Sequence, residues 1–196
     1  ADARHPAAAI ELLHNYTLIH DDLPSMDNDV ERRGKPSVWA KYGEATAILA
    51  ADAMQALAFR VAAKSPRNPV AVVDALAAAG VGVVKGQVED VAKSDGLEFI
   101  YLHKTSDLFV AAAVMGGLAA GGTDAEIAAL RVFARNLGMA FQFEDDLLDG
   151  DSPFTKTEIE SRVRETTNAA IAALSALSGN TDFLTQLAAS LVGRDK

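Results

Sequence analysis

Two clusters of aspartates are the residues whose types and spacing most clearly suggest chemistry. The first, Asp21, Asp22 and Asp27, follows an apolar stretch in which hydrophobic residues recur at helical spacing. Carboxylates are unfavourable at a helix C-terminus, and adjacent aspartates repel each other. A divalent cation would remove both costs, because Mg²⁺ prefers oxygen ligands and often bridges carboxylates to substrate phosphates. Arg32 and Arg33 follow and suit bidentate binding of diphosphate oxygens, so the pattern favours a magnesium–diphosphate site over a solvated charged loop.

The second cluster, Asp145, Asp146 and Asp149, comes directly after another apolar segment. Asp145 and Asp149 are four residues apart, which places them on one face of a helix. A group of carboxylates at the end of a buried helix is costly without a partner. One such cluster is more often a solvated helix face. Two of them in one acidic chain indicate carboxylates that face each other across bound cations.

A third candidate is Lys104, which stands near the start of a very apolar stretch, between His103 and Thr105. Its ammonium group could steady a departing diphosphate. The alternative is a lysine that packs its stem on apolar neighbours and extends its charge into water. The sequence around Lys104 leaves both interpretations open.

Helices are the elements expected to position these residues. The chain is rich in alanine and poor in proline, and its hydrophobic residues do not alternate as in strands. Thr123 and Glu126 match a capping box that opens a helix. We expect six or seven helices, no credible strand, and one all-α domain over residues 1–196. The expected ranges are 7–22, 45–64, 70–92 (interrupted by glycines), 98–120, 123–136 or 123–149, 157–177 and 181–192.

Composition excludes several classes of protein. A net charge of −9 argues against binding nucleic acid, and the lack of cysteine excludes disulfides and thiolate metal sites. The longest apolar run, 108–120, is too short to span a bilayer. The N-terminus has no signal-peptide pattern, and nothing in the sequence argues for export or for a membrane span.

Taken together, these motifs resemble the trans-isoprenyl diphosphate (polyprenyl) synthase family, most closely over residues 16–59. The resemblance implies the isoprenoid synthase fold, a helical bundle around a central apolar cavity, and usually a homodimer. It also implies a cytoplasmic location, with which the lack of a targeting signal agrees. It also implies a magnesium-dependent prenyltransferase with three ions bound around the diphosphate. Such an enzyme condenses isopentenyl diphosphate with an allylic prenyl diphosphate, here to a C15 or C20 trans-prenyl diphosphate of the farnesyl or geranylgeranyl type.

The resemblance also assigns roles to residues that match the family's motifs. The metal ligands would be Asp21, Asp22, Asp27, Asp145, Asp146 and Asp149. The groups closest to the reaction would be Lys104, Asp21 and Asp145. The substrate contacts would be His14, Arg32, Arg33, Lys104, Thr105 and Gln142, with Arg32 on the allylic diphosphate, and Arg33 and His14 on isopentenyl diphosphate. The cavity floor that limits product length would be Tyr16, beside the smaller Thr17.

The chain also departs from the family pattern. The usual basic segment upstream of the first motif does not occur, and the chain is short around Ser94–Asp95 and Asp151–Thr155. We expect that an N-terminal part and some loops are missing. Trp39 stands where many short-chain members have histidine. Two alternatives stay open: a non-catalytic or degenerate subunit of a heteromeric synthase, and a class I terpene cyclase, whose second metal motif is usually of the Asn-Ser/Thr-Glu kind.

Overall fold

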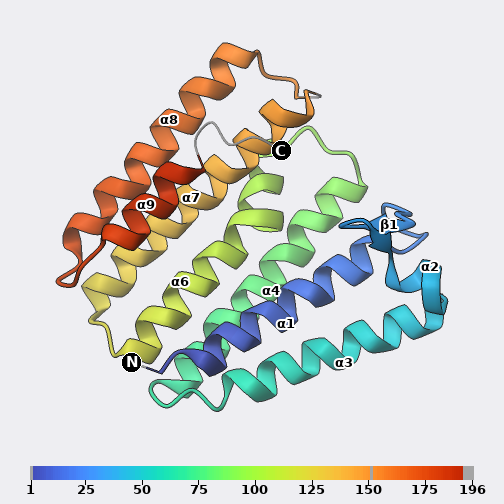
Figure 1. The fold of residues 1–196 in the computed structure, drawn as a ribbon, viewed down its shortest axis with the longest axis horizontal. Coiled ribbons are helices and arrows are strands. Elements are labelled where there is room, and N and C mark those ends of the chain that lie inside the picture. Colours follow the sequence, from blue (N-terminus) through green and yellow to red (C-terminus); the bar gives the residue numbers. More distant parts are fainter. Residues whose placement is uncertain (1, 151, 192–196) are drawn as a thin grey trace.

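Long helices dominate the structure, a computed structural model that describes residues 2–150 and 152–191 (Figure 1). The all-α fold predicted from the sequence is confirmed. The longer helices are α1 (Arg4–Asp21), α3 (Glu44–Ala62), α4 (Pro69–Val91), α6 (Asp107–Ala120), α7 (Asp124–Asp149) and α8 (Lys156–Ala173). The shorter elements are strands β1 (Glu31–Arg32) and β2 (Lys35–Pro36), helices α2 (Val38–Tyr42), α5 (Leu97–Ile100) and α9 (Asp182–Ser190), a π-helical turn η1 (Tyr101–Ser106) and a 3₁₀ turn η2 (Leu174–Ala176).

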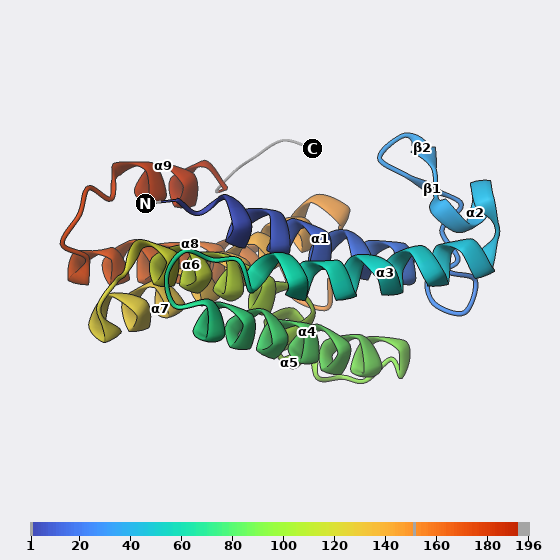
Figure 2. The ribbon, with the colours of Figure 1, turned by 90° about the horizontal axis from the view of Figure 1, so that it is seen from below.

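The long helices form a row in which α3, α1, α6, α7 and α8 succeed one another (Figure 1). Helix α4 packs against α6 and α1 from a second layer, which is seen below the row in Figure 2. The aspartate-rich ends of α1 and α7 therefore belong to two helices separated in the row by α6. This arrangement allows α4 and the segment before α6 to close the space between the two motifs.

The core is built largely from small and aliphatic side chains. One cluster, around Leu13, Leu76 and Met115, joins α1, α3, α4 and α6. A second, around Phe133 and Leu137, joins α7 to α8 and α9. Alanines contribute many of the fully buried positions, so the helix backbones approach closely and hold the site-bearing ends in fixed positions.

The helix boundaries agree with the predictions where a cap or a long periodic segment marks them. The predicted capping box is present: the Thr123 hydroxyl accepts from the Glu126 amide, and the Glu126 carboxylate accepts from the Thr123 amide. Helix α7 continues without interruption to Asp149, the longer of the two predicted ends. The interruption expected at the glycines of the third helix is wrong, since α4 runs unbroken from Pro69 to Val91.

The expectation of no strand is also wrong at one place. Residues 31–36, hereafter the β-ribbon, form a minimal antiparallel hairpin in which Glu31 pairs with Pro36 and Arg32 with Lys35. The two turn residues, Arg33 and Gly34, have φ angles of 54° and 73°. Positive φ at both positions is what a type I′ hairpin turn requires, and only glycine adopts it without cost. The ribbon escaped prediction because arginine gives no signal for this conformation.

Candidate active site

A cavity of about 1140 Å³ lies between α1, α4, η1, α6 and α7. Most of its wall is apolar, including Ile10, Leu18, Val83, Leu108, Phe109 and Phe141. Charged and polar side chains gather on it as well, and include Asp21, Arg32, Arg33, Lys104, Gln142 and Asp145. One side chain from each aspartate motif, Asp21 and Asp145, therefore faces the same space, as the sequence predicted that the motifs would.

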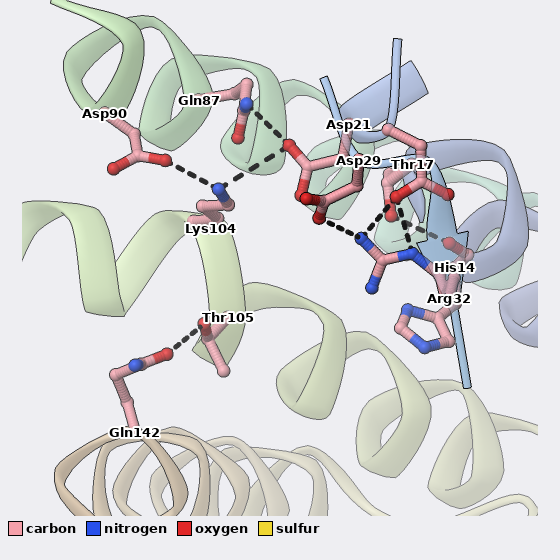
Figure 3. Close-up of polar contacts among 11 residues, drawn as sticks. His14, Thr17, Asp21, Asp29, Arg32, Gln87, Asp90, Lys104, Thr105 and Gln142 are labelled. Atoms are coloured by element: carbon pink, nitrogen blue, oxygen red, sulfur yellow. Dashed lines mark hydrogen bonds and ion pairs between the residues drawn. The ribbon is translucent and has the colours of Figure 1, made fainter. Parts of the chain in front are cut away.

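Asp21 stands at the end of α1 among groups contributed by three other segments (Figure 3). The Gln87 amide donates to the Asp21 carboxylate at 2.6 Å. The Lys104 ammonium lies 3.6 Å from the same carboxylate and donates to Asp90 at 2.6 Å. The Asp27 amide donates to the Asp21 carbonyl at 2.9 Å, which folds the loop back over the helix end. The structure thus brings Asp21 and Lys104 together and adds Gln87 and Asp90.

The ionisation of this group reflects the competition between burial and charge. Burial raises the pKa of Asp21 above its usual range, and the nearby Asp27 raises it further, although Lys104 and Arg32 oppose the shift. Burial by itself would lower the pKa of Lys104, but its hydrogen bond to Asp90 and the attraction of Asp21 outweigh that, so the pKa is raised. Lys104 is therefore a cation at neutral pH, beside a carboxylate that additional positive charge would stabilise.

Asp22 points to a different partner. It is 3 % exposed and accepts two contacts from the Arg32 guanidinium, from Nε at 2.7 Å and from Nη2 at 2.6 Å. The hydrogen bond to Asp22 raises the pKa of Arg32. Asp22 is outside the described lining of the cavity. In this structure it fixes Arg32 at the edge of the cavity, while its role as a metal ligand stays a prediction.

Neutral hydrogen-bond donors surround Asp146, one of the three aspartates of the second motif. The Asp146 carboxylate accepts from the Tyr101 hydroxyl, from Gln142 Nε2 at 3.3 Å and from Ser152 Oγ at 3.3 Å. Gln142 in turn accepts from the Thr105 hydroxyl at 2.9 Å. These bonds connect α7 to the segment that carries Lys104. The side chain of Asp149 lies outside the part of the chain that is described, and Asp27 is exposed.

Lys104 and Thr105 are presented by a π-helical turn that the sequence analysis did not foresee, since 98–120 was expected to be a single helix. The Ser106 hydroxyl bonds the Tyr101 carbonyl at 3.2 Å inside the turn. Two glycines contact the turn from opposite sides. A Cβ on Gly86 would lie 2.4 Å from the backbone nitrogen of Lys104, and a Cβ on Gly138 would lie 2.6 Å from the Ser106 Cα. Only glycine at these two positions allows α4 and α7 to pack so closely against the turn. Single π turns inside helices often occur at functional sites.

The remaining predicted residues line the cavity from α1. His14, Tyr16 and Thr17 all face it. Burial lowers the pKa of His14, and the positive charges of Arg33 and Arg32 lower it further, so its imidazole is neutral at pH 7. The Tyr16 ring packs edge-on against His20, with the ring centroids 4.8 Å apart. The Thr17 hydroxyl bonds the His14 carbonyl at 2.8 Å and is thereby turned along its own helix.

The donor set is compatible with magnesium bound together with a phosphate ligand. Among the described residues, no three Asp, Glu or His side chains lie close enough to form a metal site by themselves. Mg²⁺ does not need such a cage, because it is usually held by one or two carboxylates, waters and substrate phosphates. Asp21 and Asp145 supply carboxylates to one cavity. Burial raises the pKa of Asp21, and a bound cation would offset the cost of its buried charge.

Comparison with known proteins identifies the family of this chain. Residues 1–160 match the polyprenyl synthetase family. A chloroplastic heterodimeric geranylgeranyl pyrophosphate synthase large subunit 1 from Arabidopsis thaliana is 45 % identical over 161 residues, which cover 73 % of this chain and 43 % of that protein. A chloroplastic geranylgeranyl pyrophosphate synthase from Capsicum annuum is 43 % identical over 162 residues, 76 % of this chain and 44 % of the relative. The chain thus spans less than half the length of these relatives.

Solved structures extend the likeness to almost the whole chain. The apo structure of an FPP/GFPP synthase from Zymomonas mobilis superposes with a TM-score of 0.88 at 33 % identity and covers 96 % of this chain and 75 % of that one. A geranyltransferase from Legionella pneumophila gives 0.85 at 36 % identity, with 95 % and 73 % covered. The cavity and its polar groups therefore sit in a fold shared with these proteins.

Proposed function

The chain belongs to the polyprenyl synthetase family, and from this premise we propose that it condenses isopentenyl diphosphate with an allylic prenyl diphosphate. The product would be a short-chain trans-prenyl diphosphate. One observation carries the proposal: cations, carboxylates and amides meet on the wall of a cavity that is otherwise apolar. A substrate with a diphosphate head and a hydrocarbon tail is complementary to both surfaces.

The diphosphate heads would be bound by the cationic groups of the site. Lys104, Thr105 and Gln142 lie together along η1 and α7 and suit the allylic diphosphate. Arg32 extends into the same region from the β-ribbon, and its guanidinium group is held in place by Asp22. Arg33 and His14 line the cavity as well and would take the diphosphate of isopentenyl diphosphate. Because Asp22 holds Arg32 and Asp90 holds Lys104, these two cations add little reorganisation cost to binding.

Magnesium would be held by Asp21 and Asp145, with the other predicted aspartates near it, and when bound would neutralise the allylic diphosphate so that it becomes a better leaving group. Lys104 would add a fixed positive charge next to the departing oxygen. Gln87 and Asp90 keep Asp21 and Lys104 in place, through contacts of 2.6 Å each. The number of ions, predicted as three, stays a prediction.

The apolar wall would protect the allylic cation formed when the diphosphate leaves. Water would capture such a cation, so side chains such as Phe109, Phe141 and Leu108 serve the reaction by excluding it. The double bond of isopentenyl diphosphate would then attack the cation, and the released diphosphate would accept the proton that is lost. No nucleophilic side chain is required.

Product length would be limited by Tyr16. Its ring lies on the cavity wall five residues, or about 1.4 helical turns, before Asp21 and packs against His20. A growing chain that extends along α1 from Asp21 would pass the small Thr17 and then meet this ring. The proposed product is therefore C15 or C20, with Tyr16 as the barrier to further elongation.

We also propose that the chain acts as a homodimer. Helices α3 and α4 are long and apolar enough to cross a membrane by length and composition, a test that the core helices of globular proteins also pass. Only 22 % and 39 % of their most apolar windows are buried. Exposed side chains on them include Ile48, Leu49, Leu57 and Val81. A second copy of the chain would cover this surface, which makes association a better explanation of it than a membrane span.

A second candidate is a subunit that needs a different partner for activity. One relative is named as the large subunit of a heterodimeric synthase, which favours this possibility. The aspartates of both motifs are present in this chain, which favours an active subunit over a degenerate one. A class I terpene cyclase is disfavoured by the aspartate-rich second motif. A cytoplasmic location stays a prediction, and the plant relatives include proteins named as chloroplastic.

The proposal is tested by incubating the purified chain with labelled isopentenyl diphosphate and each allylic starter, with magnesium and with a chelator. The expected result is magnesium-dependent incorporation of label into C15 or C20 prenyl diphosphates. Incorporation only after a second protein is added would support the heteromeric alternative. Formation of a cyclic hydrocarbon without incorporation would identify a cyclase and reject chain elongation.

A further inference from the structure

Trp39, the single tryptophan of the chain, lies in α2 directly after the β-ribbon. Its indole N–H donates to the Asp29 carbonyl, ten residues earlier, at 2.8 Å. The Asp29 carboxylate in turn lies 3.8 Å from the Arg32 guanidinium (Figure 3). The indole of Trp39 is therefore hydrogen-bonded to the backbone just before the ribbon begins at Glu31.

This bond closes the loop that contains the ribbon. The ribbon itself has only two residue pairs, and a two-stranded hairpin of this size is not stable alone in water. The Ser37 amide donates to the Val30 carbonyl at 3.0 Å and ties the two strand ends together. The Trp39–Asp29 bond joins residues that flank the Val30–Ser37 pair, one step further from the tip of the ribbon. The two bonds at the base of the loop therefore restrict the movement of its tip.

The two arginines of the ribbon differ in how far they depend on this restraint. Arg32 is fixed independently, because its guanidinium makes two short contacts with the buried Asp22. Arg33 is exposed at the turn, with φ at 54°, and no hydrogen bond or ion pair holds its guanidinium within residues 2–150 and 152–191. A non-glycine residue in this conformation persists only where its surroundings enforce it. Loosening the base of the loop should therefore affect Arg33 more than Arg32.

We propose that Trp39 is a positioning residue that, through its bond to the Asp29 carbonyl, holds the β-ribbon so that Arg33 faces the cavity. This inference rests on the proposed function in one respect: Arg33 is taken to bind isopentenyl diphosphate and Arg32 the allylic diphosphate. Trp39 then sets the affinity for one substrate and leaves the other nearly unchanged. Because a ring N–H is the feature that matters, a histidine in its place should retain part of the effect.

The test compares W39F, which keeps an aromatic ring without the N–H, with W39H, which keeps a ring N–H donor. Y42F serves as the matched control, because Tyr42 is in the same short helix and 59 % exposed. In the ligand-free chain, W39F should speed amide hydrogen exchange over residues 29–37 by about three- to tenfold, the factor supplied by one ordinary hydrogen bond. Exchange in W39H should be closer to that of the wild type, and Y42F should not differ from it.

Steady-state kinetics, with the KM of each substrate measured separately, is the second test. W39F should raise the KM for isopentenyl diphosphate by about three- to tenfold, again the factor of one hydrogen bond. The KM for the allylic substrate should change less than the KM for isopentenyl diphosphate. Unchanged exchange in W39F, a W39H variant as impaired as W39F, or equal rises in both KM values would overturn the proposal. If the wild type itself consumes no isopentenyl diphosphate, the proposed function fails, while the exchange comparison still decides the role of Trp39.

Discussion

The site has two halves that are stabilised in different ways. The first-motif half surrounds Asp21 and Asp22 at the end of α1, and the second-motif half surrounds Asp145 and Asp146 at the end of α7. On the first-motif side, carboxylates are matched by cations: Asp22 by Arg32, and Asp21 and Asp90 by Lys104. On the second-motif side, the described partners of Asp146 are the neutral donors Tyr101, Gln142 and Ser152. Figure 3 shows the first group gathered around Asp21, with Thr105 and Gln142 lying apart from it.

This difference indicates what each half contributes. The first-motif half already holds opposite charges close together, so a diphosphate with its cations would replace one set of ionic contacts by another. At Asp146 the described partners are neutral, so the cations of a bound ligand would add positive charge next to this carboxylate. We therefore expect charge to be decisive in the first half, and hydrogen-bond geometry to matter comparatively more at Asp146.

The largest difference is expected between the variants Asp21→Asn and Asp146→Asn. Asp21→Asn removes the charge that faces Lys104 and the cavity, and should lower kcat/KM by about 100-fold or more. Asp146→Asn keeps an oxygen that can accept from Tyr101 and Ser152, and should cost about tenfold, as for residues that orient metal ligands. Steady-state kinetics with both substrates measures the two losses.

The thermal stability of Asp21→Asn provides the control for that comparison. Burial raises the pKa of Asp21, so the ionised side chain destabilises the folded state at pH values above its ordinary pKa. Replacing it by a neutral amide should therefore leave the unfolding temperature at pH 7 unchanged or raise it. Equal activity losses in Asp21→Asn and Asp146→Asn would contradict the distinction between the halves.

The connection between the two halves is tested by Gly138→Ala. The new methyl group would lie 2.6 Å from the Ser106 Cα, so η1 must move, at a cost of about 1–3 kcal/mol in folding free energy. Because η1 carries Lys104 and Thr105, we expect kcat to fall by about tenfold or more, as for misplaced catalytic groups.

Gly116→Ala is the matched control, because a Cβ there meets nothing within 4 Å. That variant should keep full activity and gain up to about 1 kcal/mol from better helix propensity. Thermal unfolding and initial rates measure both variants. A Gly138→Ala variant with wild-type activity would show that the close approach of α7 is not needed to position η1.

A more local effect is expected deeper in the first-motif half. Tyr16→Ala removes the ring proposed as the cavity floor and should shift the main product upward by at least one isoprene unit, whereas Tyr16→Phe should not. Chromatographic sizing of labelled products measures the change. An unaltered product distribution in Tyr16→Ala would assign the floor to another residue.

The smallest effect is expected far from both halves, at the N-terminus of α7. Hydrogen bonds from Ser178 and from the Thr123 amide hold the pKa of Glu126 at about 2, below its ordinary value of 4.5. A lowered carboxyl pKa stabilises the fold above the unfolded-state value, and that contribution disappears as the pH falls from about 4.5 to about 2.

Glu126→Gln should therefore lower the unfolding temperature slightly at pH 6, and the difference from the wild type should shrink as the pH approaches 2. Calorimetry at a series of pH values follows this difference. A gap that stays constant with pH would show that the charge of Glu126 does not contribute to stability.

The sequence predicted the parts of this molecule that depend on local patterns. Helical periodicity located the long helices, and the Thr123–Glu126 pair located the start of α7 because a capping box is a local interaction. The spacing of the aspartates placed both motifs at helix ends, and one side chain of each lines the cavity. The sequence left the end of this helix open between residues 136 and 149, and the structure continues it to Asp149.

Other features depend on contacts that periodicity does not encode. The π turn at 101–106 depends on Gly86 and Gly138, which come from two other helices. The pairing of Asp22 with Arg32 depends on the β-ribbon, whose turn uses an arginine with positive φ. The bond from Trp39 to Asp29 is of the same kind. Sequence reasoning therefore identified candidate ligands, and tertiary packing determined which of them face the cavity.

The account depends most on one claim, that a single diphosphate is bound between the ends of α1 and α7. The most direct test is a crystal structure of the chain with magnesium and a non-reactive allylic thiolodiphosphate. We predict that the diphosphate lies beside Lys104, with magnesium between it and the carboxylates of Asp21 and Asp145, and the hydrocarbon tail along the apolar wall towards Tyr16. A diphosphate bound elsewhere, or one without metal contacts to both motifs, would contradict the account.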